Sequence, residues 1–122
     1  MAKILVIDDD VLVRDTITRI LERKGYQVLV TGDGARGVSM FRSEQPDLVI
    51  TDIIMPEKEG LATIREIREE CPNAKIVAIS GGARIGNMDF LDIAGKLGAS
   101  EIIAKPFDPS DLLNLVSRCL DG

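Results

Sequence analysis

The stretch Asp47-Leu48-Val49-Ile50-Thr51-Asp52-Ile53-Ile54-Met55-Pro56 decides the fold, because it joins an apolar run to a carboxylate and then to a proline. The run from Leu48 to Thr51 is typical of a strand buried on both faces of a parallel sheet. Asp52 then follows where this strand leaves the sheet. Because ligands of open α/β sheets bind outside the carboxyl ends of the strands, we expect chemistry at Asp52.

The composition of the chain indicates one domain and excludes several classes of site. At 122 residues and 45% apolar content, residues 1–122 predict a single ordered domain with no second, effector domain. A net charge of −5 and the absence of a Lys/Arg run argue against nucleic-acid binding. Cys71 and Cys119 are too few for a disulfide framework and are expected to be buried thiols. No signal peptide or membrane span is visible, so we expect a cytoplasmic protein without membrane contact.

Short segments rich in Val and Ile alternate with segments of helical spacing along the whole chain. The expected strands are Lys3–Ile7, Gln27–Thr31, Asp47–Thr51, Lys75–Ile79 and Glu101–Ala104. A helix is predicted after each strand, on apolar residues spaced by three and four. This alternation predicts an α/β fold, flavodoxin-like and doubly wound, (βα)5, with a five-stranded parallel sheet of order 2-1-3-4-5 and helices on both faces.

Cap residues give the expected limits of these helices. Asp10 is expected to be the N-cap of the first helix rather than a metal ligand, and Gly25 its C-terminal cap. Asp33 is a plausible N-cap for the second helix, whose apolar positions include Ala35. Gly34 and Gly37 weaken that second prediction, since glycine disfavours helix. The fourth helix is expected over 87–98, on Phe90, Ile93, Ala94 and Leu97, and Asn87 could open it.

Polar side chains follow four of the predicted strands, and parallel strands bring them to one edge of the sheet. They are Asp8, Asp9 and Asp10 after the first strand, Asp52 after the third, Ser80 after the fourth and Lys105 after the fifth. Clustered carboxylates repel one another and need a cation. Oxygen ligands without His or Cys select a hard ion, Mg²⁺ or Mn²⁺. A carboxylate beside such an ion can attack a phosphoryl group, which an ammonium and a hydroxyl would stabilise. The sequence therefore predicts an aspartyl-phosphate site.

These motifs resemble the receiver domain of bacterial response regulators, the CheY-like phosphoacceptor half of two-component signalling. The resemblance covers essentially the whole chain and is carried by Ile7-Asp8-Asp9, Asp52 with Met55-Pro56 and Gly60, Ser80, and Lys105-Pro106-Phe107. It implies that Asp8, Asp9, Asp52 and the backbone carbonyl of Ile54 hold Mg²⁺. It also implies that Ser80 and Lys105 contact the phosphoryl oxygens, and that the Lys105–Pro106 bond is cis.

The resemblance further implies a function. Asp52 would accept a phosphoryl group from a phosphohistidine of a sensor histidine kinase or a histidine phosphotransfer protein. The result would shift a face made by the fourth helix, the fifth strand and the fifth helix, with protein–protein contact as the output. Such a protein is not an ordinary enzyme, because it would catalyse only its own phosphorylation and slow dephosphorylation.

Three positions depart from the common receiver pattern. Ile102 stands where many receivers carry an aromatic switch residue, so we expect the output change to come from the loop after Ser80 and the fourth helix. That loop, Gly81–Gly86, could absorb a backbone change or could simply be flexible. Ile54 and Gly82 occupy positions that tune hydrolysis, and neither can orient a water molecule. We therefore expect a long-lived phosphoryl group.

Two other functions use related features. A phosphatase or phosphotransferase of the haloacid dehalogenase type would use Asp8 as its nucleophile, but Leu12 stands where its motif carries Thr or Val, and its second acidic pair is missing. A flavodoxin-like FMN carrier would need a Ser/Thr/Gly phosphate loop and aromatic residues. Here three carboxylates, Asp8 to Asp10, would repel phosphate in the absence of a metal.

Overall fold

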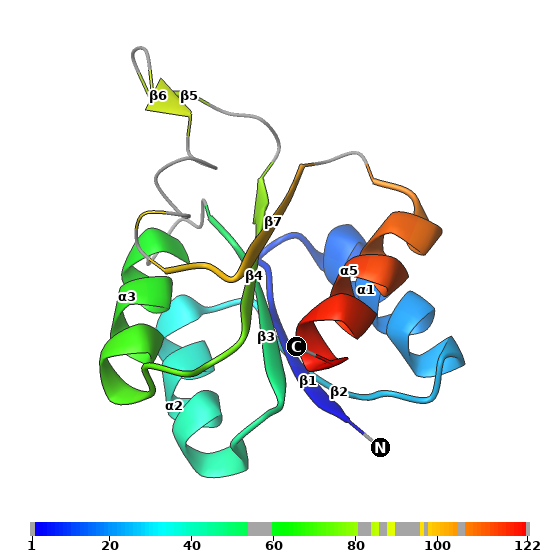
Figure 1. Cartoon of the computed structure of the whole chain (residues 1–122), viewed down its shortest axis with the longest axis horizontal. Coiled ribbons are helices and arrows are strands. Elements are labelled where there is room, and N and C mark those ends of the chain that lie inside the picture. The colour runs from blue at the N-terminus through cyan, green and yellow to red at the C-terminus, as the bar shows by residue number, and fades with distance from the viewer. Residues whose placement is uncertain are drawn as a thin grey trace.

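The computed structural model describes residues 2–53, 60–80, 84–85, 88–89, 96, 98–104 and 107–121. Figure 1 shows a central sheet with helices on both sides. The strands of the sheet are β1 (Lys3–Ile7), β2 (Gln27–Thr31), β3 (Leu48–Asp52), β4 (Ile76–Ser80) and β7 (Glu101–Ala104). The helices are α1 (Val11–Arg23), α2 (Gly34–Glu44), α3 (Gly60–Glu70) and α5 (Pro109–Asp121).

The five strands of this sheet are all parallel and lie in the order β2-β1-β3-β4-β7. This confirms the predicted flavodoxin-like order 2-1-3-4-5. Since β1 and β3 are neighbours, with Ile7 opposite Thr51, the residues that follow them arrive side by side at the carboxyl edge. The topology therefore brings the turn after β1 next to Asp52.

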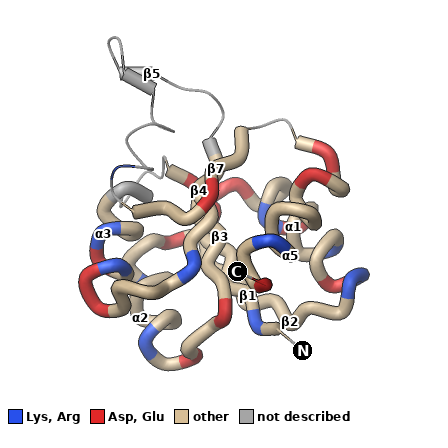
Figure 2. Tube along the Cα trace, in the orientation of Figure 1, with Lys and Arg blue, Asp and Glu red and all other residues tan. Residues whose placement is uncertain are grey.

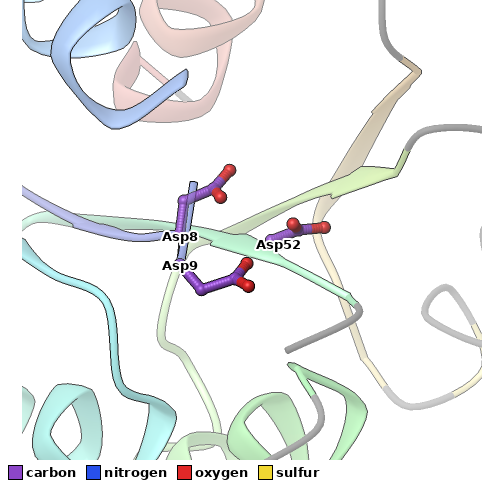
Figure 3. A group of neighbouring side chains, drawn as sticks. All are labelled: Asp8, Asp9 and Asp52. Atoms are coloured by element: carbon purple, nitrogen blue, oxygen red, sulfur yellow. The ribbon is translucent and has the colours of Figure 1, made fainter. Parts of the chain in front are cut away.

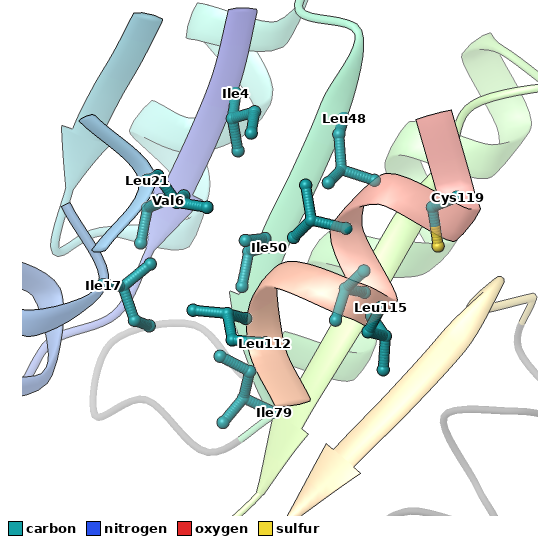
Figure 4. Close-up of a cluster of buried hydrophobic side chains, with 12 residues drawn as sticks. Ile4, Val6, Ile17, Leu21, Leu48, Ile50, Ile79, Leu112, Leu115 and Cys119 are labelled. Atoms are coloured by element: carbon teal, nitrogen blue, oxygen red, sulfur yellow. The ribbon is translucent and has the colours of Figure 1, made fainter. Parts of the chain in front are cut away.

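Aliphatic side chains on the two faces of the sheet form two cores. α2 and α3 cover one face, where Val38, Ile64 and Ile67 pack against Leu5 and Ile7. α1 and α5 cover the other face, where Figure 4 shows Ile17, Leu21 and Leu112 over Val6 and Ile50. The sheet is thus buried on both sides, and this explains the continuous apolar run in the sequence of β3.

Two strands end one residue later than the sequence predicted. β3 is Leu48–Asp52 rather than Asp47–Thr51, because Asp52 still pairs with Ile79 and the Ile53 amide donates to the Ile79 carbonyl at 3.0 Å. β4 is Ile76–Ser80 rather than Lys75–Ile79, and Ser80 pairs with Ala104. Asp52 and Ser80 are therefore the last residues of their strands, held by the sheet itself.

The predicted caps of α1 and α2 are confirmed. The Asp10 carboxylate accepts from the amides of Leu12 (2.9 Å) and Val13 (3.4 Å), which satisfies two free donors of the helix. Asp33 does the same for α2. Gly25 follows α1 with a φ of 94°, a conformation that glycine adopts without strain. Ala35, one of the apolar positions that predicted α2, is exposed on the first turn of this helix.

The segment after β4 differs from the prediction where it is described. Arg84–Ile85 (β5) pairs antiparallel with Met88–Asp89 (β6), so the expected helix does not begin at 87. Most of the expected helical segment, including Phe90, lies outside the described residues.

Two further features concern the cysteines and the membrane. The Cys119 thiol is buried as predicted, and this burial raises its pKa, whereas Cys71 is only half-buried. No helix in the described ranges is both long and apolar enough to cross a bilayer.

Gly37 lets α2 approach the strand that leads into the site. A Cβ built on Gly37 would overlap the side chain of Ile7, the residue directly before Asp8. Gly37, which weakened the helix prediction, therefore allows close packing of α2 against Ile7, since only a residue without a side chain fits this contact.

We predict that Gly37→Ala destabilises the fold, because a methyl group overpacks the site by about 1–3 kcal/mol, more than the roughly 1 kcal/mol that alanine gains in a helix. Urea unfolding measures this difference. In an Ile7→Val background, which removes the overlapping Cδ1 atom, the same change should cost less. A Gly37→Ala variant that is more stable than the wild-type protein, which carries Ile7, would contradict this account.

Candidate functional site

Three carboxylates meet at the carboxyl edge of the sheet. Asp8 follows β1 and is 1% exposed, Asp9 is exposed, and Asp52 ends β3 and is 8% exposed. One carboxylate oxygen from each lies within 4.8 Å of the others. Figure 3 shows the side chains of Asp8 and Asp9 extending from the end of β1 beside Asp52. The structure thus brings together the three acidic residues that the sequence predicted as metal ligands.

Backbone contacts fix the turn that carries Asp8 and Asp9. The Asp8 amide donates to the Thr31 carbonyl at 3.1 Å, which extends the β1–β2 ladder by one residue. Asp8 Oδ1 accepts from the Asp10 amide at 2.9 Å, and Asp10 in turn caps α1. Asp10 therefore acts as predicted, as a cap that holds the turn and not as a member of the carboxylate group.

Arg14 is a residue of this site that the sequence analysis missed. It lies on α1, and its Nη1 atom donates to the backbone carbonyl of Asp8 at 3.2 Å. A contact from a side chain to a main-chain carbonyl six residues earlier follows no helical or strand period. No pattern in the sequence could have indicated it.

Of the other predicted site residues, Ser80 and Ile102 lie within the part of the chain that the structure describes. Ser80 ends β4, but its side chain lies outside the described atoms. Ile54, Gly82 and Lys105 also lie outside the described residues, so their roles stay predictions. Ile102 lies half-buried in β7 opposite Ala78.

The donor set of the cluster fits a hard divalent cation. It offers carboxylate oxygens alone, and the chain contains no histidine. Two of the three carboxyl groups are buried, where the charged form costs free energy unless a counter-charge is near. Oxygen ligands of this kind suit Mg²⁺ and Mn²⁺ better than zinc or copper. The site can therefore hold such a metal ion.

Comparison with known families decides among the interpretations that this geometry allows. The family described as the response regulator receiver domain matches residues 4–117. The chain belongs to this family. This is the family that the sequence motifs resemble, and the match supports neither the haloacid dehalogenase nor the flavin-carrier alternative.

Relatives of this receiver domain include single-domain and longer proteins. It is 36% identical over 120 residues to the chemotaxis protein CheY of Thermotoga maritima, covering 95% of this chain and 98% of that one. It is 35% identical over 121 residues to the DNA-binding transcriptional regulator NtrC of Azospirillum brasilense, covering 99% of this chain but 24% of the relative. A solved CheY-like receiver domain protein of Methanospirillum hungatei matches with a TM-score of 0.91 and 29% identity over 99% of this chain and 94% of that one.

We predict that Asp9→Asn stabilises the receiver domain when no divalent cation is present. The change removes one of three charges within 4.8 Å, which should raise the free energy of unfolding by on the order of 1 kcal/mol. Urea unfolding in a chelator measures this effect. Asp15→Asn is the matched control, because Asp15 is an exposed carboxylate of α1 outside the cluster. The carboxylates do not repel one another if Asp9→Asn stabilises no more than Asp15→Asn does.

Proposed function

We propose that this receiver domain is a phosphoacceptor switch in which Asp52 takes a phosphoryl group from a phosphohistidine. The donor is a sensor histidine kinase or a histidine phosphotransfer protein. The observation that carries the proposal is the position of Asp52, at the end of β3, with a carboxylate oxygen within 4.8 Å of oxygens of Asp8 and Asp9. Among the described residues, this group is the one set of acidic or thiol side chains close enough together to hold a metal.

The proposed cofactor is Mg²⁺, held by Asp8, Asp9, Asp52 and the backbone carbonyl of Ile54. When bound, it supplies positive charge against the carboxylates and against the oxygens of the incoming phosphoryl group. The residues of the chain orient this site. The Asp10 amide fixes one oxygen of Asp8, and Thr51 Oγ1 donates to the Asp52 carbonyl at 3.0 Å, which ties the end of β3.

The reaction moves one phosphoryl group from a histidine nitrogen of the donor to a carboxylate oxygen of Asp52. An oxygen of the Asp52 carboxylate attacks phosphorus, a P–O bond forms, and the P–N bond to the donor imidazole breaks. The imidazole keeps the electron pair and takes up a proton. Ser80, the last residue of β4, and Lys105, which follows β7 in the sequence, are proposed to contact the phosphoryl oxygens.

The proposed product is retained because water is poorly placed to attack it. Ile54 and Gly82 offer no polar side chain that could orient a nucleophilic water. The chain would thus hold its signal and pass it on through protein contacts. Figure 2 shows the described Lys and Arg residues scattered over the chain, which does not favour nucleic acid as the partner.

Two exposed apolar residues border the acidic cluster and suit a docking protein. Val11 (54% exposed) and Leu12 (78% exposed) begin α1, directly after Asp10. Apolar side chains this exposed gain free energy when a partner covers them. We place the phosphodonor on this pair, because any donor to Asp52 must approach the same edge of the sheet.

We predict that Mg²⁺ and a small phosphodonor add one phosphoryl group to the wild-type protein, and that Asp52 carries it. Intact mass spectrometry detects the adduct. Reduction with borohydride converts the acyl phosphate to homoserine, which peptide mapping locates. Asp52→Asn should lose the adduct. The control Asp47→Asn, which changes the carboxylate directly before the first residue of the same strand, should keep it. A homoserine at position 8 would contradict the proposal.

We predict that Leu12→Asp slows phosphotransfer from a phosphohistidine protein by about tenfold, the value of burying one leucine side chain. The rate with a small phosphodonor should stay within about twofold, since a small molecule needs no docking surface. Quenched-flow labelling gives both rates. An equal loss with both donors would show that Leu12 supports the site itself and not the docking of a protein.

A further inference from the structure

The guanidinium of Arg14 contacts a backbone carbonyl of the acidic turn and not a carboxylate. Its Nη1 atom donates to the Asp8 carbonyl at 3.2 Å, and the side chain is half-buried. Within the described ranges, Arg14 forms no ion pair, although Asp8 and Asp9 lie in the same turn. A hydrogen bond from a guanidinium is stronger than one between neutral groups. This contact therefore restrains the backbone of the turn that carries Asp8 and Asp9.

Gly32 makes the space that this guanidinium occupies. A Cβ built on Gly32 would lie 2.5 Å from Arg14 Nη1, and 3.6 Å from both the Asp8 carbonyl oxygen and the Asp9 Cα. The absent side chain of Gly32 thus lets Arg14 reach Asp8 from the β2–α2 side of the turn. Its φ does not lie in the left-handed region, so alanine fits the backbone there. Its closest neighbour would be the end of a flexible side chain, which can move.

We propose that Arg14 is a positioning residue for the divalent cation. It holds the turn Asp8–Asp10 from one side, while the Asp8 amide is held by Thr31 from the other. The two restraints together keep the Asp8 and Asp9 carboxylates directed at Asp52. This inference rests on the proposed function only for the identity of the ion, Mg²⁺.

Arg14 affects the affinity for Mg²⁺ in two opposite ways. The direction in which the affinity changes when Arg14 is removed therefore tests the proposal. As a positive charge near the cluster, Arg14 repels the ion, and its removal would tighten binding by up to a few-fold. As a restraint on the turn, it pre-organises two ligands, and its removal weakens binding. The second effect is larger, because a charge-assisted hydrogen bond outweighs a solvent-screened repulsion.

The test is the Mg²⁺ dissociation constant of the unphosphorylated protein, measured by isothermal titration calorimetry. The variants are Arg14→Met, Arg14→Lys, Gly32→Ala and the double variant Arg14→Met/Gly32→Ala. Urea unfolding of each in a chelator reports on the fold alone. We expect Arg14→Met to weaken Mg²⁺ by about fivefold to tenfold. Arg14→Lys should recover part of this loss, because an ammonium can still donate one hydrogen bond to the Asp8 carbonyl.

Gly32→Ala provides the second, independent variant, because it displaces the guanidinium and keeps the charge. It should weaken Mg²⁺ about as much as Arg14→Met does, and the double variant should be no weaker than either single variant. Unchanged or tighter binding in Arg14→Met would overturn the proposal, as would additive losses in the double variant. A wild-type protein that binds no Mg²⁺ would instead contradict the metal part of the proposed function, and the positioning role with it.

Discussion

Repulsion among three carboxylates is the constraint on which the rest of this receiver domain depends. Oxygens of Asp8, Asp9 and Asp52 lie within 4.8 Å of one another, and two of these residues are buried. No folded chain gathers such charges without a cost, which is of the order of 1 kcal/mol for each pair even in water. A divalent cation in the proposed site would offset this cost. The proposed function follows from the same arrangement, since an incoming phosphoryl group would also need that positive charge.

The sheet and its two cores supply the stability that this edge lacks. Parallel pairing places the end of β1 beside the end of β3, and aliphatic side chains cover both faces. The acidic turn is then fixed by contacts that use its backbone: the Thr31 carbonyl, the cap at Asp10 and the guanidinium of Arg14. The turn is thus held through its main chain and through one oxygen of the Asp8 carboxylate.

Much of this structure could be predicted from the sequence, for identifiable reasons. The strand order follows from strict alternation and handedness, and the caps at Asp10 and Asp33 follow from local chemistry. The last pairs of β3 and β4 could not be predicted, because they depend on neighbouring strands. Arg14 makes a contact without a periodic pattern, and Gly37 was interpreted as a weak helix former although it serves packing against Ile7. The antiparallel pairing of β5 with β6 was also missed, because this segment was assigned to a loop and to the start of a helix.

The most direct test of the central claim is the position of a bound ion. Crystals grown with Mn²⁺, which shares the oxygen preference of Mg²⁺, give an anomalous signal that locates the metal without assumptions about activity. The account predicts one strong peak within coordination distance of oxygens from Asp8, Asp9 and Asp52. A protein saturated with Mn²⁺ that shows its peak elsewhere, or shows none at this edge of the sheet, would contradict it.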